Sequence, residues 1–274
     1  MGAFFLPRTA CYCLRPLPFA IIELKYDNAR QFAAGAKLNL PLMKSEKCSE
    51  CPIRHRAVCA SCDTDEFERL ESLKYYCSFD AGQPIMWSGD RMTFVGSVVS
   101  GVATIEQLME DGRKQTMGLL LPSDFIGRPG REVAQYDVTA VTDVTLCCFR
   151  REGFEKLVSD TPHIAQRMLE MALDELDAAR DWMLLLGRKT AREKIATFLI
   201  MIARRTTPEK CDKLMIQLPL TRESMADYLG LTIETVSRQI SAFRKEGLIR
   251  LEGSRTVEIL DRTALLDESG SFAA

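Results

Sequence analysis

The chain has 274 residues, of which 46% are hydrophobic and 27% charged, and its formal net charge is −2. These values are typical of a soluble globular protein long enough for two domains. No apolar run approaches the roughly 20 residues that span a bilayer, and the first residues lack the apolar core and cleavage site of a secretory signal. We therefore expect a cytoplasmic protein without a membrane partner.

The N-terminal part divides into an extension and a cysteine-rich loop. Residues 1–42 contain four prolines and no sustained hydrophobic period, so we expect them to be poorly structured. Residues 43–64 form the loop, with cysteines in two pairs of equal spacing: Cys48 and Cys51, then Cys59 and Cys62. Because reducing compartments do not sustain structural disulfides, thiols concentrated in this way indicate a metal centre.

Two kinds of metal centre fit these cysteines. The four thiolates alone could form a tetrahedral zinc site. An iron-sulfur cluster is also held by thiolates, commonly from clustered cysteines and a remote fourth. A candidate for the remote ligand lies far downstream in the pair Cys147 and Cys148. The residue pattern leaves both kinds of centre open.

Residues 65–160 are expected to form a sensor domain. A short amphipathic helix over Asp65–Leu73 precedes a series of short strands, and Asp111-Gly112 is a strong hairpin signal between two of them. Many short strands at regular spacing predict an antiparallel barrel or double-sheet roll. The predicted strand runs are Thr93–Val99, Val102–Leu108, Gln115–Leu121 and Asp137–Phe149.

Strand alternation separates the two downstream cysteines. Within Val144–Phe149, Cys148 shares a face with Val144 and Leu146, whereas Cys147 lies on the opposite face. The apolar face is the better candidate for the core, so Cys148 is interpreted as a small buried hydrophobe. Cys147 is then free to meet the cysteine loop. A centre held by Cys48, Cys51, Cys59 and Cys147 would tie the loop to the barrel.

Residues 161–187 are predicted to form a dimerisation helix. Thr161-Pro162 opens it, since proline suits the first helical position. Apolar residues then recur at alternating spacings of three and four, as in the a/d seam of a coiled coil. The seam, through which we expect the helix to pair with its twin in a homodimer, consists of Leu169, Ala172, Leu176, Ala179, Met183 and Leu186.

Residues 188–274 carry the features of a DNA-binding domain. The segment 188–255 has 14 Lys and Arg against 8 Asp and Glu, so the rest of the chain carries −8. A basic module joined to an acidic one suits contact with a polyanion. Arg222–Leu229, a turn at Gly230 and a second helix capped by Thr232 predict a helix-turn-helix, and two short strands after it predict a wing.

The second helix of this unit offers side chains for reading bases. Glu234, Ser237 and Arg238 lie opposite its apolar face. An arginine near the start of a recognition helix can donate two hydrogen bonds to guanine, and a carboxylate one turn earlier can accept from cytosine. A simple surface ion pair between Glu234 and Arg238 is the alternative interpretation.

Taken together, these segments resemble the FNR branch of the CRP/FNR transcription regulators over residues 45–265. The resemblance rests on CSECPIRHRAVCASC, TLCCFRREGFEKL, WMLLLGRKTAREKIA and LGLTIETVSRQISAF. It implies an α+β fold with an N-terminal antiparallel β-roll of the cyclic-nucleotide-binding type, a long dimerisation helix and a C-terminal winged helix-turn-helix. No enzymatic activity is implied.

The resemblance also implies a function and its residues. The expected homodimer carries one oxygen-labile [4Fe-4S] cluster per subunit, binds an inverted repeat of TTGAT-type half-sites in double-stranded DNA and regulates genes of low-oxygen metabolism, with RNA polymerase as a further partner. The family pattern assigns the cluster to Cys48, Cys51, Cys59 and Cys147, and base reading to Glu234, Ser237 and Arg238.

The chain departs from the family pattern at two points. Better-known members space their second and third ligands more tightly, which leaves Cys62 as an alternative to Cys59. Many members also carry an acidic residue on the dimer helix where this chain has Ala179. The rival interpretation is a regulator activated by a cyclic nucleotide or another small ligand, with a structural zinc site. Its phosphate anchor, an Arg-Ser pair, is missing from the turn Asp124–Pro129.

Overall fold

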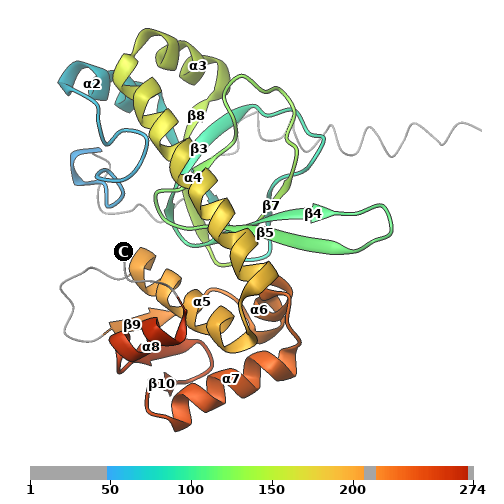
Figure 1. The fold of residues 1–274 in the computed structure, drawn as a ribbon. Coiled ribbons are helices and arrows are strands. Elements are labelled where there is room, and N and C mark those ends of the chain that lie inside the picture. The colour runs from blue at the N-terminus through green and yellow to red at the C-terminus, as the bar shows by residue number, and fades with distance from the viewer. Residues whose placement is uncertain (1–47, 207–213, 271–274) are drawn as a thin grey trace, which may run out of the picture. The chain divides into compact units, whose positions relative to one another are not determined.

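The structure is a computed structural model that describes residues 48–206 and 214–270 (Figure 1). The predicted extension over residues 1–42 and the first part of the 43–64 loop lie outside the described residues. Within the described ranges, no helix is both long and apolar enough to cross a membrane.

The domain predicted over residues 65–160 is built from two four-stranded antiparallel sheets. One has the order β1-β8-β3-β6 and the other β2-β7-β4-β5. Their facing sides enclose an apolar core that includes Val98, Leu120 and Leu146. This arrangement confirms the predicted double-sheet roll. The strands are β1 (Lys74–Phe79), β2 (Pro84–Met86), β3 (Phe94–Ser100), β4 (Ala103–Leu108), β5 (Lys114–Leu120), β6 (Phe125–Ile126), β7 (Asp137–Ala140) and β8 (Val144–Arg150).

The turns of the roll follow local sequence in part. The β4–β5 hairpin closes where expected, with Gly112 at a φ of 86° and its N–H bonded to the Met109 carbonyl. The predicted run Asp137–Phe149 is two strands, since the chain turns at residues 141–143 between β7 and β8. Gly101 makes this turn possible, because a Cβ there would lie 2.0 Å from the Asp143 carbonyl oxygen.

Three helices follow or precede the roll. The first, α2 (Thr64–Leu73), starts with a capping box. The Glu66 backbone N–H donates to the Asp63 carboxylate, and the Asp63 backbone N–H donates to the Glu66 carboxylate. α3 (Arg151–Asp160), which the sequence analysis did not predict, covers the end of β8. α4 (Pro162–Arg188) is the predicted long helix, with proline in its first turn. At about 1.5 Å per residue, it is about 40 Å long.

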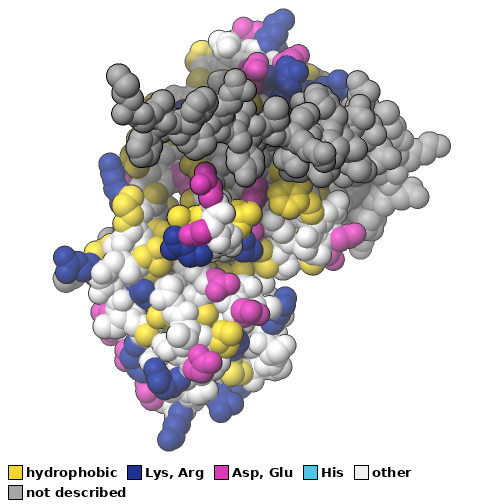
Figure 2. All heavy atoms as spheres, turned by 90° about the vertical axis from the view of Figure 1, so that its right-hand side faces the viewer, with side chains coloured by type: hydrophobic (Ala, Val, Ile, Leu, Met, Phe, Trp, Pro, Cys, Tyr) yellow, Lys and Arg dark blue, Asp and Glu magenta, His cyan; other side chains and the backbone are white. Residues whose placement is uncertain are grey.

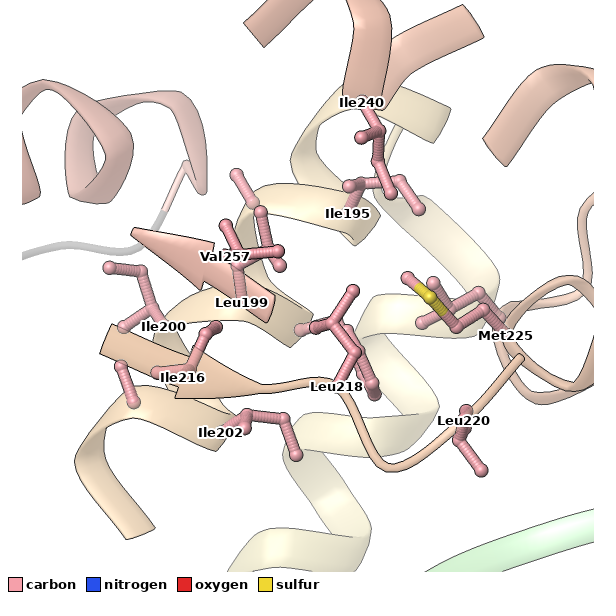
Figure 3. Packing of buried hydrophobic residues seen from close by; sticks show 14 of the residues in the cluster. Ile195, Leu199, Ile200, Ile202, Ile216, Leu218, Leu220, Met225, Ile240 and Val257 are labelled. Carbon is pink, nitrogen blue, oxygen red and sulfur yellow. The ribbon is translucent and has the colours of Figure 1, made fainter. Parts of the chain in front are cut away.

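The C-terminal domain is a winged helix-turn-helix, as predicted. Apolar side chains from α5, β9, α6, α7 and β11 point toward one another in its core (Figure 3). The three-stranded wing has the order β10-β11-β9, one strand more than expected. The elements are α5 (Ala191–Thr206), β9 (Leu214–Gln217), α6 (Arg222–Leu229), α7 (Ile233–Lys245), β10 (Ile249–Glu252), β11 (Thr256–Ile259) and α8 (Arg262–Glu268).

Candidate metal centre and nucleic-acid interface

The cysteine loop, residues 48–63, is held together by short-range turns. It begins with the 3-10 turn η1 (Cys48–Glu50), and the Cys51 N–H donates to the Cys48 carbonyl at 3.2 Å. Ile53 and Ala57 are buried, and they pack with Val99 of the roll. These apolar contacts hold the loop against the roll, and Cys51 and Cys59 pack against the same cluster.

The sheet supplies one further cysteine to the loop. In β8, Cys147 is paired in register with Tyr76 of β1 on one side and Ser97 of β3 on the other. Residues in register project to the same face. Cys148 projects to the interior of the roll, where it is 0% exposed and belongs to the apolar core against which Cys77 packs. The two cysteines therefore take the opposite faces that alternation predicted.

A small, partly enclosed cavity lies between the loop and the sheet. Its volume is about 20 Å³, and its lining includes the side chains of Cys48, Cys51, Cys59 and Cys147. Those are the four predicted ligands, brought together from two segments far apart in sequence. The lining does not include Cys62, although Cys62 packs against the same apolar cluster as Cys59.

Burial and the neighbouring thiols favour the protonated form of Cys59 and Cys147. Burial, with the neighbouring Cys51 and Cys48, raises the pKa of Cys59 to about 11. Burial and the same loop thiols raise the pKa of Cys147 to about 12. A metal cation removes this penalty because it replaces the protons and neutralises the thiolates. Four converging soft donors are the ligand set that zinc and iron-sulfur centres both use, so the residues present fit such a centre.

A lysine that the sequence analysis overlooked stands beside the thiols. The Lys74 ammonium nitrogen lies 3.0 Å from the Cys48 sulfur, and its side chain is 9% exposed. Glu71 accepts the Cys48 backbone N–H at 3.0 Å. Burial opposes the charge of Lys74, but its bond to Cys48 and the nearby negative groups raise the pKa of the lysine overall. A positive charge thus faces the site where thiolates would gather.

An arginine connects the cysteine loop to the long helix. Arg167 of α4 donates from Nη2 to the Arg56 carbonyl at 2.7 Å and from Nε to the Ala57 carbonyl at 3.5 Å. Both carbonyls lie between the second and third cysteines of the cavity. The side chain also pairs with Glu170 at 3.0 Å. The position of the loop and that of α4 are therefore physically coupled.

The predicted dimer seam forms an apolar stripe along α4. Leu169, Leu176 and Met183 are 61%, 44% and 67% exposed. Ala172 is also exposed, whereas Ala179 and Leu186 are half-buried, and Leu186 packs against the core of the C-terminal domain. Such a run of exposed large apolar side chains at heptad spacing is the surface that a second helix covers.

The helix-turn-helix presents its predicted base-reading residues to solvent. Thr232 caps α7 by accepting the Thr235 N–H at 3.2 Å, and Gly230 adopts the left-handed conformation that the turn requires, with φ 61°. Glu234, Ser237 and Arg238 are all exposed. No ion pair between Glu234 and Arg238 appears among the described residues, so the guanidinium is available to a ligand.

The opposite face of α7 anchors the helix. Val236, Ile240 and Phe243 are buried in the domain core. In Figure 2, Lys and Arg side chains stand out along the lower margin of the molecule, the level at which Figure 1 shows α7 and β10. Basic side chains around an exposed recognition helix suit a phosphate backbone.

Two family models match the chain. The model of the Crp-like helix-turn-helix domain covers residues 193–268. The model of the cyclic nucleotide-binding domain covers residues 76–161. The two matches coincide with the C-terminal domain and the β-roll.

Relatives match over most of the chain. The transcriptional activator protein FnrL of Cereibacter sphaeroides is 62% identical over 228 residues, which cover 82% of this chain and 92% of that protein. The nitrogen fixation regulation protein FixK of Bradyrhizobium diazoefficiens is 38% identical, over 74% of this chain and 86% of its own. The solved structure of FixK2 from Bradyrhizobium japonicum aligns with a TM-score of 0.67 at 32% identity, and covers 73% of this chain and 99% of that one. With these matches over both domains, the chain belongs to the CRP/FNR family of transcription regulators, in its FNR-type branch.

Proposed function

We propose that this protein is an oxygen-responsive transcription regulator in which a [4Fe-4S] cluster stabilises the DNA-binding homodimer. The observation that carries the proposal is the convergence of four thiols on one small cavity, from the cysteine loop and from β8. Cys48, Cys51, Cys59 and Cys147 would hold the cluster. When bound, such a cluster supplies a centre that oxygen degrades.

The residues around the cavity would turn cluster binding into a change at the helix. Thiolates held at fixed positions restrict the loop, and the restricted loop keeps its carbonyls at Arg56 and Ala57 in place for Arg167. Arg167 then favours one position of α4. When the cluster is lost, the loop is no longer restricted and α4 no longer favours this position. The population then shifts away from paired helices.

The paired helices would set the spacing of the two recognition helices. Two-fold symmetric helix-turn-helix proteins place these helices about 34 Å apart, one turn of DNA. On each half-site of the TTGAT type, Arg238 would donate to a guanine and Glu234 would accept from a cytosine on the opposite strand, with Ser237 alongside. The bound dimer would act on genes of low-oxygen metabolism by contact with RNA polymerase.

The rival cyclic-nucleotide interpretation finds less support at the turn where its phosphate anchor would lie. There Asp124 accepts the Leu121 N–H at 2.8 Å and forms an ion pair with Arg205. A carboxylate at this point repels a phosphate, and the arginine that contacts this carboxylate, Arg205, is already paired with it. The match to the cyclic nucleotide-binding domain model therefore describes the fold of the roll.

Anaerobic purification tests the proposal. We expect a brown protein with close to four iron and four sulfide per subunit. We expect Cys147→Ser to lose the iron and Cys62→Ser, the matched control outside the cavity, to keep it. A colourless protein that retains zinc would refute the proposal. If Cys62→Ser loses the iron and Cys59→Ser keeps it, the assignment of the third ligand is wrong.

A further inference from the structure

The cavity contains a polar group for which the protein provides no partner. Ser97 of β3 is 2% exposed, and its hydroxyl has no hydrogen-bond partner among the described residues. Buried hydroxyls are nearly always paired, because an unpaired one has lost water without replacing it. An unpaired hydroxyl in a wall of the proposed metal site therefore calls for an explanation.

The register of the sheet aims this hydroxyl at the thiols. Ser97 is the direct cross-strand neighbour of Cys147, so the two side chains share the face that the cysteine loop covers. Both side chains line the cavity, together with Cys48, Cys51 and Cys59. Lys74 and Tyr76 are the polar members of the rest of the lining, and the Ser97 hydroxyl bonds to neither of them. The other members are apolar: Ile53, Ala57, Val58, Phe67, Leu70 and Phe149.

The Ser97 hydroxyl differs from the Lys74 ammonium, another polar neighbour of the thiols, in what it can do. Lys74 brings a charge to Cys48 at the loop side. Ser97 brings one O–H donor from the sheet side, beside Cys147. A neutral thiol accepts a hydrogen bond weakly, whereas an anionic sulfur accepts it well. Ser97 therefore has a good partner only when metal-bound, anionic sulfur is present.

We propose that Ser97 is a positioning residue of the metal centre, which donates its hydroxyl hydrogen bond to anionic sulfur at the Cys147 side. The inference rests on the proposed function and deepens it. Hydrogen bonds to the sulfurs are among the features that tune iron-sulfur centres. Ser97 thereby stabilises the loaded state without being a ligand.

The chain offers a matched control for this residue. Thr161, at the N-terminal cap of α4, is 1% exposed, and its hydroxyl too has no partner among the residues that the structure describes. It does not line the cavity. Ser97→Ala and Thr161→Val each remove one unpaired buried hydroxyl with little change of shape, but only the first removes a donor to the centre.

The test compares wild type with both variants in three measurements. The first is the unfolding temperature of the metal-free protein. The second is the rate at which an iron chelator removes iron from the loaded protein under anaerobic conditions. The third is the shift of the Fe–S stretching bands in resonance Raman spectra after loading in D₂O instead of H₂O.

We expect metal-free Ser97→Ala to be as stable as wild type or more so, because it loses a hydroxyl without a partner. The loaded variant should lose iron about fivefold faster, the equivalent of one net hydrogen bond, and its D₂O shift should be smaller. Thr161→Val should match wild type in iron loss and in the D₂O shift.

Three results would overturn the inference. Wild-type rates of iron loss in Ser97→Ala, an undiminished D₂O shift, or a clear loss of stability in the metal-free variant would each assign the hydroxyl another role. These outcomes differ from failure of the proposed function, in which wild type itself takes up no iron and sulfide.

Discussion

Removal of the Arg167 side chain should uncouple the metal centre from dimerisation. Arg167 occupies an f position of the heptad in which Leu169 is a, so it faces away from the seam and toward the cysteine loop. Arg167 donates hydrogen bonds to the Arg56 and Ala57 carbonyls. Among the described residues, no other side chain of α4 forms a hydrogen bond with the cysteine loop. Arg167→Ala therefore affects the connection without altering the dimer surface.

The size of the effect follows from these contacts. The bond to Arg56, at 2.7 Å, is exposed to solvent but has a charged donor, so it contributes about 1 to 2 kcal/mol. The contact with Ala57, at 3.5 Å, is too long to add much. The pair with Glu170 lies within α4 and does not couple the loop to it. A loss of 1 to 2 kcal/mol corresponds to a factor of about 5 to 30.

Sedimentation equilibrium measures this coupling. The dimer dissociation constant is determined for anaerobically loaded protein and for metal-free protein. The constant of the metal-free protein divided by that of the loaded protein is then compared between variants. We expect Arg167→Ala to lower this ratio about 5 to 30-fold for each subunit of the dimer while it keeps the full iron content. Asp174→Ala, at the next f position of the same helix, is the control and should leave the ratio unchanged.

Two results would refute this reasoning. A wild-type ratio in Arg167→Ala would show that the coupling runs through other contacts, such as the apolar packing of Val58 near Ile164. Complete loss of iron would show that Arg167 supports the loop itself rather than its connection to the helix.

Three further predictions concern the helices and the thiols. Arg238→Ala should cost about 1 to 3 kcal/mol of binding free energy at its guanine and relax specificity there, and an equal loss on random DNA would restrict Arg238 to phosphate contact. Leu176→Glu should yield a folded monomer in sedimentation, because a charge replaces an exposed seam residue; an intact dimer would move the interface elsewhere. The metal-free protein should lose stability as pH rises from about 9 toward 12. In the folded state the pKa of Cys59 is raised to about 11 and that of Cys147 to about 12. Both thiols therefore ionise more readily in the unfolded chain, and rising pH favours unfolding. Thermal melts should show a flatter decline for the Cys59→Ser, Cys147→Ser double variant, and an equal decline would contradict the pKa assignment.

Features specified by local sequence were predictable. The helix-turn-helix follows from the Thr232 cap, the Gly230 turn and the three-and-four spacing of apolar residues, each a short-range signal. The hairpin at Gly112 and the long helix after Pro162 are likewise local. Alternation along β8 was enough to send Cys147 and Cys148 to opposite faces.

Features that depend on tertiary packing were not predictable. β1 was missed because Lys74–Phe79 has no clear alternation, and with it Lys74 as a neighbour of the thiols was missed too. The bond from Arg167 joins residues 111 positions apart. The sequence analysis also left Cys59 and Cys62 as alternatives, because both belong to the second cysteine pair of the loop. Only the folded loop shows that Cys59 lines the cavity and Cys62 does not.

The most direct test of the central claim is the affinity of one anaerobically loaded sample for an inverted repeat of TTGAT half-sites, measured before and after exposure to air. We expect the affinity to fall at least tenfold as the iron is lost, and the affinity for random DNA to change little. If the protein binds the repeat equally tightly after the iron has gone, the metal centre does not control DNA binding, and the proposed function is wrong.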